Sequence, residues 1–253
     1  YDFKDIMTNP QLASRVTLEP VEELGVDGAI IFTDILIVPE ALGMETTFDA
    51  GGPRLGFSLQ DADEPTKLLF NNTEKFEPVA RTIEEVRKNK PDHIPVIGFS
   101  GAPFTVLCYM LEGKSSRNNF FDVARYMYEK PKAVHQLMET ITDMTITYAM
   151  RQIDAGIDIF QVFDTHAGSL PYSFYSEFCL PYVQKIIQAV RKKNIPVIFF
   201  PKGIGMGYAQ IDASITDYLS IDWQTPISEV SKNKDPKMGL QGNIDPRLFL
   251  ADQ

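Results

Sequence analysis

Six short apolar runs recur along the chain, separated by longer stretches in which apolar and polar residues alternate with a helical period. The runs cover residues 28–34, 94–100, 157–164, 195–200, 217–222 and 237–241. Continuous apolar runs of this length are typical of strands buried on both faces, as in parallel sheets. The alternation of such strands with helices predicts parallel strands joined by right-handed crossovers.

The stretches between the runs have helical patterns. They cover residues 73–89, 118–129, 132–153 and 175–193. The third stretch gathers its apolar side chains near one face of the predicted helix, namely Val134, Leu137, Met138, Ile141 and Tyr148. The last stretch ends in Arg191-Lys192-Lys193, a basic final turn that complements the negative end of a helix dipole.

Two architectures fit this alternation, an open doubly wound sheet and a (β/α)₈ barrel of the TIM type. Each predicted strand ends in a distinctive group: Asp34, Ser100-Gly101-Ala102-Pro103, Asp164-Thr165-His166, Lys202-Gly203, Asp222-Trp223 and Gln241-Gly242-Asn243. In a barrel, many strand ends contribute functional residues to one face of the molecule, whereas in an open sheet the functional residues gather at one crevice. The sequence therefore favours an α/β barrel.

A closed barrel of this type has eight strands, and the pattern predicts about six. Residues 1–20 have the pattern of a loop and helix leading into the first of these strands, and the last residues have that of a helix leading to another. We expect a further strand to belong at each end. Residues 1–253 would then be a single barrel domain truncated at both ends.

Composition narrows the class of partner. The chain has 253 residues, of which 44% are hydrophobic, and a formal net charge of −10. This charge disfavours nucleic acids and anionic membranes as partners, and no apolar run approaches the about 20 residues of a membrane span. No secretion leader stands at the start, and Cys108 and Cys179 lie in apolar surroundings, so we expect a reducing, cytoplasmic location.

An acidic small molecule is still compatible with the charge, because a local basic cleft can oppose the global sign. The candidates for such a cleft near strand ends are Lys114, Arg117 and Lys202. A metal site is not predicted, since His93, His135 and His166 are far apart and no Cys-x-x-Cys or His-x-Cys occurs.

Asp34 closes an otherwise unbroken apolar run, which makes it the most informative single position. A carboxylate at the end of a buried strand loses solvation unless a donor compensates it. Two interpretations are open: an aspartate that caps a helix or pairs with an arginine, or an acid placed at the mouth of a barrel to meet a ligand. Tyr109 taken alone would be a core tyrosine with a satisfied hydroxyl.

Several segments together resemble the uroporphyrinogen decarboxylase family. They are Ala29-Ile30-Ile31-Phe32-Thr33-Asp34-Ile35-Leu36 with Pro39 and Ala41-Leu42-Gly43-Met44; Gly98-Phe99-Ser100-Gly101-Ala102-Pro103-Phe104-Thr105 with Tyr109-Met110 and Glu112-Gly113; Gln161-Val162-Phe163-Asp164-Thr165-His166-Ala167-Gly168; Phe178-Cys179-Leu180-Pro181-Tyr182; Asp222-Trp223; and Leu240-Gln241-Gly242-Asn243-Ile244-Asp245-Pro246. They occur in family order and cover nearly the whole chain.

The resemblance implies a cofactor-free carboxy-lyase on a (β/α)₈ barrel. Such an enzyme removes four acetate carboxylates from uroporphyrinogen III to give coproporphyrinogen III, and family members are typically cytoplasmic homodimers. By motif position, Asp34 resembles the aspartate that accepts the pyrrole N–H groups and Tyr109 the substrate-binding tyrosine. Thr165, Phe32 and Ile30 stand at further substrate-binding positions.

Two family segments fall outside the chain: an arginine-bearing segment, expected before residue 1, and a histidine strand, expected after residue 253. Two alternatives therefore stay open. One is a zinc-dependent corrinoid methyltransferase of the same superfamily, against which the absence of His-x-Cys after the run 195–200 argues. The other is a non-catalytic protein that retains the barrel scaffold.

The chemistry suits an aspartate without a cofactor. Protonation of a pyrrole carbon makes the ring cationic and so provides the electron sink that decarboxylation of an attached acetate needs. A fixed carboxylate beside the ring nitrogens would stabilise this developing cation more than the neutral ground state. We hypothesise that Asp34 stays ionised because the N–H donors favour its charged form.

Overall fold

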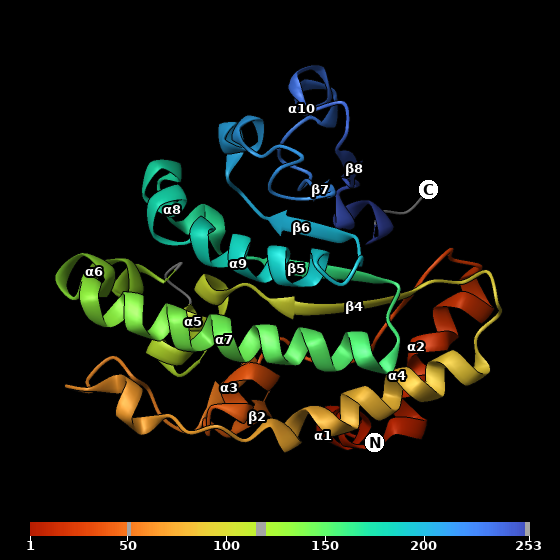
Figure 1. The fold of residues 1–253 in the computed structure, drawn as a ribbon, viewed down its shortest axis with the longest axis horizontal. Helices are drawn as coiled ribbons and strands as arrows, with labels where there is room; N and C mark the ends of the chain where they lie inside the picture. The colour runs from red at the N-terminus through yellow and green to blue at the C-terminus, as the bar shows by residue number, and fades with distance from the viewer. Residues whose placement is uncertain (50–51, 115–119, 251–253) are drawn as a thin grey trace.

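Six parallel strands form one sheet in the order β1-β4-β5-β6-β7-β8 (Figure 1). The structure is a computed structural model that describes residues 1–49, 52–114 and 120–250. The strands of this sheet are β1 (Ala29–Ile30), β4 (Val96–Gly101), β5 (Ile159–Asp164), β6 (Val197–Pro201), β7 (Tyr218–Ser220) and β8 (Gly239–Gln241). The predicted α/β fold with parallel strands at all six apolar runs is confirmed, and β1 and β8 are the edges of this described sheet.

Helices connect the strands as parallel pairing requires. The α-helices are α1 (Phe3–Thr8), α2 (Pro10–Leu24), α3 (Ile37–Ala41), α4 (Glu77–Asn89), α5 (Pro103–Glu112), α6 (Phe121–Glu129), α7 (Pro131–Ala155), α8 (Tyr172–Phe178), α9 (Leu180–Arg191) and α10 (Ile227–Asn233). Short 3₁₀ turns are η1 (Pro65–Leu68), η2 (Thr73–Phe76), η3 (Ala167–Ser169), η4 (Gly205–Gln210) and η5 (Pro246–Leu250). The long helices α7 and α9 run across one face of the sheet in Figure 1.

Helix α7 is tied to β4 by one buried amide. The Gln152 side chain accepts a hydrogen bond from the Phe99 backbone N–H (3.1 Å) and donates one to the Phe99 carbonyl (3.0 Å). A Cβ at Gly98 would lie 2.4 Å from Gln152 Oε1, so only glycine leaves room for this contact. The side chain thus satisfies two backbone groups of the strand while it fixes the helix on the sheet.

The predicted strand over 28–34 is longer than the observed one. Only Ala29 and Ile30 pair as a strand with β4, although Ile31 N–H still donates to the Ile97 carbonyl (3.1 Å). The next N–H, that of Phe32, donates to the Thr17 hydroxyl of α2 (2.9 Å) instead. This side-chain acceptor ends the ladder, so Asp34 follows the strand at a short distance.

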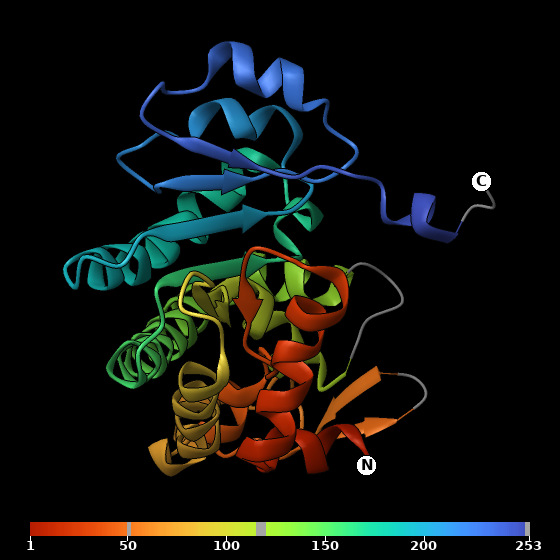
Figure 2. The same cartoon turned by 90° about the vertical axis from the view of Figure 1, so that its right-hand side faces the viewer.

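Two further differences concern helices and a hairpin. The helical stretch 175–193 divides into α8 and α9, with a proline in the first turn of α9. The pattern did not predict the antiparallel hairpin of β2 (Thr46–Asp49) and β3 (Gly52–Leu55). Figure 2 shows this hairpin on the side toward which the strand arrowheads point (Figure 2). Residues 118 and 119, part of the predicted helix 118–129, lie outside the described residues.

The two faces of the sheet differ in burial because successive side chains of a strand point to opposite faces. Phe160 and Val162 of β5 are fully buried under helices. On the other face, Ile30 lies beside Ile97 and is 51% exposed, and Tyr218 of β7 is 45% exposed. Aromatic side chains line this second face. This is the face that a closed barrel would enclose.

Candidate active site

A buried carboxylate organises the carboxyl end of β5. Asp164 has no exposed surface and accepts hydrogen bonds from the Thr105 hydroxyl of α5 (2.6 Å) and the Tyr175 hydroxyl of α8 (2.6 Å). Burial raises its pKa to about 6, although both donors act in the opposite direction. Asp164 thus faces the helix layer, where it joins two helices to the strand.

The same threonine fixes the turn that follows β5. The Thr105 hydroxyl oxygen also accepts the backbone N–H of His166 (3.2 Å). The His166 ring lies with its Nε2 atom 3.4 Å from the Tyr109 hydroxyl and its centroid 4.3 Å from the Phe120 ring. Burial, followed by the charge of Lys202, lowers the pKa of His166 to about 4, so its imidazole is neutral at pH 7.

Tyr109 thus contacts His166, the residue that directly follows Thr165 in the chain. Thr165 lies between Asp164 and His166 in this turn and is half-buried. Tyr109 is one helical turn beyond Thr105 on α5, so both side chains lie on the same side of the helix. The sequence singled out Tyr109 and Thr165 but not the contact of Tyr109 with His166.

Asp34 lies in the turn between β1 and α3. Its Oδ1 atom accepts the backbone N–H of Leu36 (2.6 Å), as aspartates commonly do two residues before the donor in a turn. Burial raises the pKa of Asp34. The hydrogen bond from Leu36 opposes this shift, and the negative charge of Glu40 adds to it. No lysine or arginine of the described residues is in ion-pair contact with it. Asp34 therefore neither caps α3, whose N-cap is Leu36 without a side-chain hydrogen bond, nor pairs with an arginine of the described residues. The interpretation that it meets a ligand, and the hypothesis that ligand N–H groups keep it ionised, stay predictions.

Strand order places these groups at one edge of the sheet. Strands β1, β4 and β5 are neighbours and parallel, so the segments after their carboxyl ends share an edge. A Cβ at Gly101 would lie 3.1 Å from Ile35 Cβ, which shows that the turn of Asp34 lies against the end of β4. Ile30 is on the open face of β1, and the Phe32 ring is 5.3 Å from that of Phe3.

The ends of β6 and β7 form a second group of polar contacts. The Asp222 carboxylate accepts from Tyr208 Oη (2.6 Å) and from the backbone N–H groups of Gly203 (2.8 Å) and Gln224 (2.8 Å). Burial opposes ionisation, but these donors together hold its pKa below the usual range. Lys202 Nζ lies 5.2 Å from the centre of the Trp223 ring.

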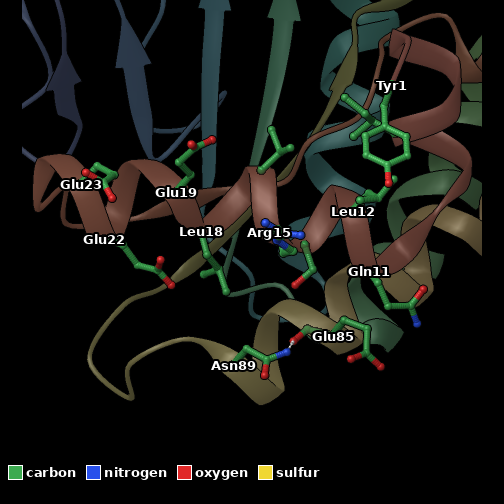
Figure 3. A pocket seen from close by; sticks show the side chains of 13 residues that line it. Tyr1, Gln11, Leu12, Arg15, Leu18, Glu19, Glu22, Glu23, Glu85 and Asn89 are labelled. Carbon is green, nitrogen blue, oxygen red and sulfur yellow. Dashed lines mark hydrogen bonds between the residues drawn. The ribbon is translucent and has the colours of Figure 1, made fainter.

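Within the described ranges, no three His, Cys, Asp or Glu side chains gather as metal ligands would, and no helix there is long and apolar enough to cross a membrane. A cavity of about 610 Å³ lies between α2 and α4 and is lined by Arg15, Glu19, Glu22 and Glu85 among others (Figure 3). None of the predicted site residues lines it.

Comparison with known proteins assigns the fold and the family. The family model described as "Uroporphyrinogen decarboxylase (URO-D)" matches residues 1–253. Proteins named uroporphyrinogen decarboxylase from Myxococcus xanthus and Geobacter metallireducens are each 38% identical to the chain; the matches cover 98% of the chain and 72% and 73% of the relatives. One from Neisseria meningitidis is 37% identical and covers 96% of the chain and 70% of that relative.

Solved structures share the fold at low identity. A methyltransferase from Methanosarcina mazei superposes with a TM-score of 0.74 at 19% identity and covers 95% of this chain and 71% of that one. A B12-independent methionine synthase from Shewanella superposes with a TM-score of 0.59 at 12% identity and covers 92% and 70%. The family match over all 253 residues and the relatives at 37–38% identity show that the chain belongs to the uroporphyrinogen decarboxylase family.

Proposed function

We propose that the chain carries the decarboxylase activity of its family, the removal of the four acetate carboxylates of uroporphyrinogen III to give coproporphyrinogen III without a cofactor. Family membership supports the reaction. The observation that supports the site is that the Asp34 turn, the helix α5 with Tyr109 and the turn with Thr165 follow three neighbouring parallel strands. Ile30 and Phe32 would contact the substrate from the open face and end of β1.

Asp34 is the proposed electrostatic residue. The raised pKa in the free protein reflects burial with a single backbone donor. Pyrrole N–H groups gathered around this carboxylate would supply the missing donors and lower that pKa, so binding would favour the charged form. At about 4 Å, a carboxylate and a protonated pyrrole interact by about 4 kcal/mol at an effective dielectric near 20.

The test replaces the charge and keeps the shape. We expect Asp34→Asn to lower kcat by up to about a thousandfold, since each 1.36 kcal/mol of lost transition-state stabilisation is about tenfold in rate. The measurement is release of coproporphyrinogen from uroporphyrinogen, resolved by chromatography. Asp27→Asn, at an exposed position before β1, is the matched control. Normal turnover by Asp34→Asn would refute the electrostatic role.

Tyr109 is the proposed orienting residue. Its hydroxyl lies 3.4 Å from His166 Nε2, beside the turn after β5, and from there we expect it to donate to an acetate. We expect Tyr109→Phe to slow the later decarboxylations most, because late intermediates have fewer carboxylate anchors. Accumulation of partly decarboxylated intermediates measures this, and Tyr128→Phe, at an exposed site of α6, is the control. An unchanged intermediate profile would contradict the assignment.

The proposal extends to a cytoplasmic homodimer that binds neither nucleic acid nor membrane. The family resemblance supports the dimer and the location, and the two free, buried cysteines are compatible with a reducing compartment. The net charge of −10 disfavours nucleic acid. Light scattering on the purified protein tests the dimer, and a monomeric mass at micromolar concentration would exclude it.

A further inference from the structure

Lys202 is held in place at the carboxyl end of β6. Its backbone N–H donates to the Asp164 carbonyl (3.1 Å), and its carbonyl accepts the N–H of Gly168 (2.9 Å). A Cβ at Gly168 would lie 2.5 Å from the Gly203 carbonyl oxygen, so the two turns pack backbone against backbone. The origin of the Lys202 side chain is therefore fixed relative to the turn that carries Thr165 and His166.

The ammonium group of Lys202 has an aromatic neighbour but no acidic partner among the described residues. Its Nζ atom lies over the Trp223 ring, and no carboxylate of those residues is in ion-pair contact with it. The charge of Lys202 acts on Asp222, but that carboxylate already receives three hydrogen bonds from Tyr208, Gly203 and Gln224. A half-buried ammonium in this position retains its capacity to pair with an incoming anion.

This ammonium is adjacent to the proposed active site. The charge of Lys202 acts on the His166 ring, whose Nε2 atom lies 3.4 Å from the Tyr109 hydroxyl. The other two basic residues expected near strand ends do not occupy this place. Lys114 is exposed beyond the far end of α5, where its backbone forms an isolated antiparallel β-bridge with Arg54. Arg117 lies outside the described residues.

We propose that Lys202 binds a carboxylate side chain of the substrate, from the β6 side of the corner formed by Tyr109 and His166. This inference rests on the proposed function, because the polycarboxylate is the decarboxylase substrate. The Trp223 ring lies beneath the ammonium group of Lys202 at 5.2 Å, a cation–π contact that leaves the N–H groups on the other side available to a carboxylate. The ligand class is an acetate or propionate carboxylate on a tetrapyrrole. Lys202 would thus give the anionic substrate a local positive contact in a chain whose net charge is −10.

The test compares Lys202→Met, which keeps the stem but removes the charge, with Lys202→Arg, which restores a cation. Lys192→Met, at the exposed end of α9, removes the same charge far from the strand ends. We expect Lys202→Met to raise KM for uroporphyrinogen about tenfold or more with a much smaller change in kcat. Lys202→Arg should recover most of the affinity, and Lys192→Met should match the parent.

Direct binding separates this inference from the proposed reaction. Trp223 is the single tryptophan of the chain, so quenching of its fluorescence measures the affinity for a porphyrin, and the Lys202 variants show whether that affinity depends on the Lys202 charge. Uroporphyrin is the probe, and its methyl ester, which lacks the charges, is the comparison. We expect Lys202→Met to weaken binding of the acid about tenfold and to leave binding of the ester unchanged.

The outcomes are distinguishable. Equal affinity of the parent and Lys202→Met for uroporphyrin, with equal KM, would overturn the role of Lys202 and leave the decarboxylase proposal standing. Equal weakening of acid and ester binding would also overturn it, because the effect would then come from packing on Trp223. Charge-dependent binding in a protein that releases no coproporphyrinogen would support the carboxylate anchor and refute the proposed reaction.

Discussion

Two buried aspartates at strand ends show how burial, hydrogen bonds and nearby charge together set the pKa of an acid. Asp164 receives two hydroxyl donors in a site without exposed surface, and burial raises its pKa to about 6. Asp222 is equally hidden, but Tyr208 and two backbone N–H groups donate to it, and its pKa is lowered. At the scale of single residues, burial competes with hydrogen bonding, and the nearby cation Lys202 also helps to lower the pKa of Asp222.

Thr105 links Asp164 to the site, so its hydroxyl is expected to affect both stability and activity. Thr105→Val keeps the shape but removes the donor to Asp164 and the acceptor for His166 N–H. We expect a loss of about 1–3 kcal/mol in the free energy of unfolding, measured by urea denaturation, and a reduced rate of decarboxylation. Thr105→Ser should restore most of both.

The control for this change is Thr142→Val. Thr142 is also fully buried, but its hydroxyl donates only to the Met138 carbonyl of its own helix. We expect this variant to lose less stability and to keep parental activity. If Thr105→Val behaved like Thr142→Val in the rate measurement, Thr105 would have no positioning role.

The raised pKa of Asp164 gives a pH dependence of definite sign. Between about pH 4 and 6 the folded protein holds a proton on this carboxyl that the unfolded chain has released, so stability falls as pH rises through this window. The difference in unfolding free energy between the parent and Asp164→Asn should decline with pH by up to about 1.4 kcal/mol per unit there. Urea midpoints at several pH values measure it, and a flat difference would contradict it.

Titration of His166 is expected to change the stability in the opposite direction, over a pH range that overlaps with that of Asp164. Its pKa is lowered to about 4, so its contribution to stability is complete above about pH 6.5 and is lost as pH falls toward 4. The unfolding free energy of the parent should therefore change little between pH 4 and 6. In His166→Gln the unfolding free energy should fall with pH by the full amount that Asp164 contributes. Identical slopes in the parent and His166→Gln would exclude a perturbed histidine.

At the scale of elements, the sequence predicts the sheet well because its six apolar runs are bounded by turns. The hairpin β2–β3 was not predicted, since its strands have four residues each and the second contains Gly52 and Pro53, which usually argue against a strand. The end of β1 was also not predictable. It depends on the Thr17 hydroxyl of α2, which takes the Phe32 N–H away from the sheet.

The packing of the turns after β5 and β6 yields a test at the same scale. Gly168→Ala would place its Cβ 2.5 Å from the Gly203 carbonyl, so one of the two turns must shift. We expect a loss of about 1–3 kcal/mol in unfolding free energy, as for other overpacked sites, together with a slower reaction. Gly56→Ala, whose nearest contact would be 3.6 Å, is the control. Equal stability of both variants would show that the turns are loosely packed.

At the scale of the whole molecule, the sequence predicted the parallel strands β1, β4 and β5 that precede Asp34, Tyr109 and Thr165, and these strands are neighbours. The substrate-binding roles of the three residues stay predictions. The environment of these residues was not predictable. The contact between Tyr109 and His166 joins residues 57 positions apart, and no spacing rule connects them.

The net charge of −10 makes a prediction for association with an anionic substrate. Long-range repulsion slows encounter at low salt, and the screening length shortens from about 30 Å at 0.01 M to about 10 Å at 0.1 M. We expect the association rate constant for uroporphyrin, measured by stopped-flow quenching of Trp223, to rise over this range. A rate that falls with added salt would instead show that a local basic field dominates the approach.

Helix α5 has a consequence for engineering. Thr105 contacts the buried acid and Tyr109 reaches the corner with His166, one helical turn apart on a rigid rod. Any rotation or slide that relaxes one contact displaces the other by a comparable amount. Attempts to broaden substrate choice by replacing Tyr109 should therefore succeed more often when Thr105 is kept, and random libraries that vary both positions should be dominated by unfolded or inactive clones.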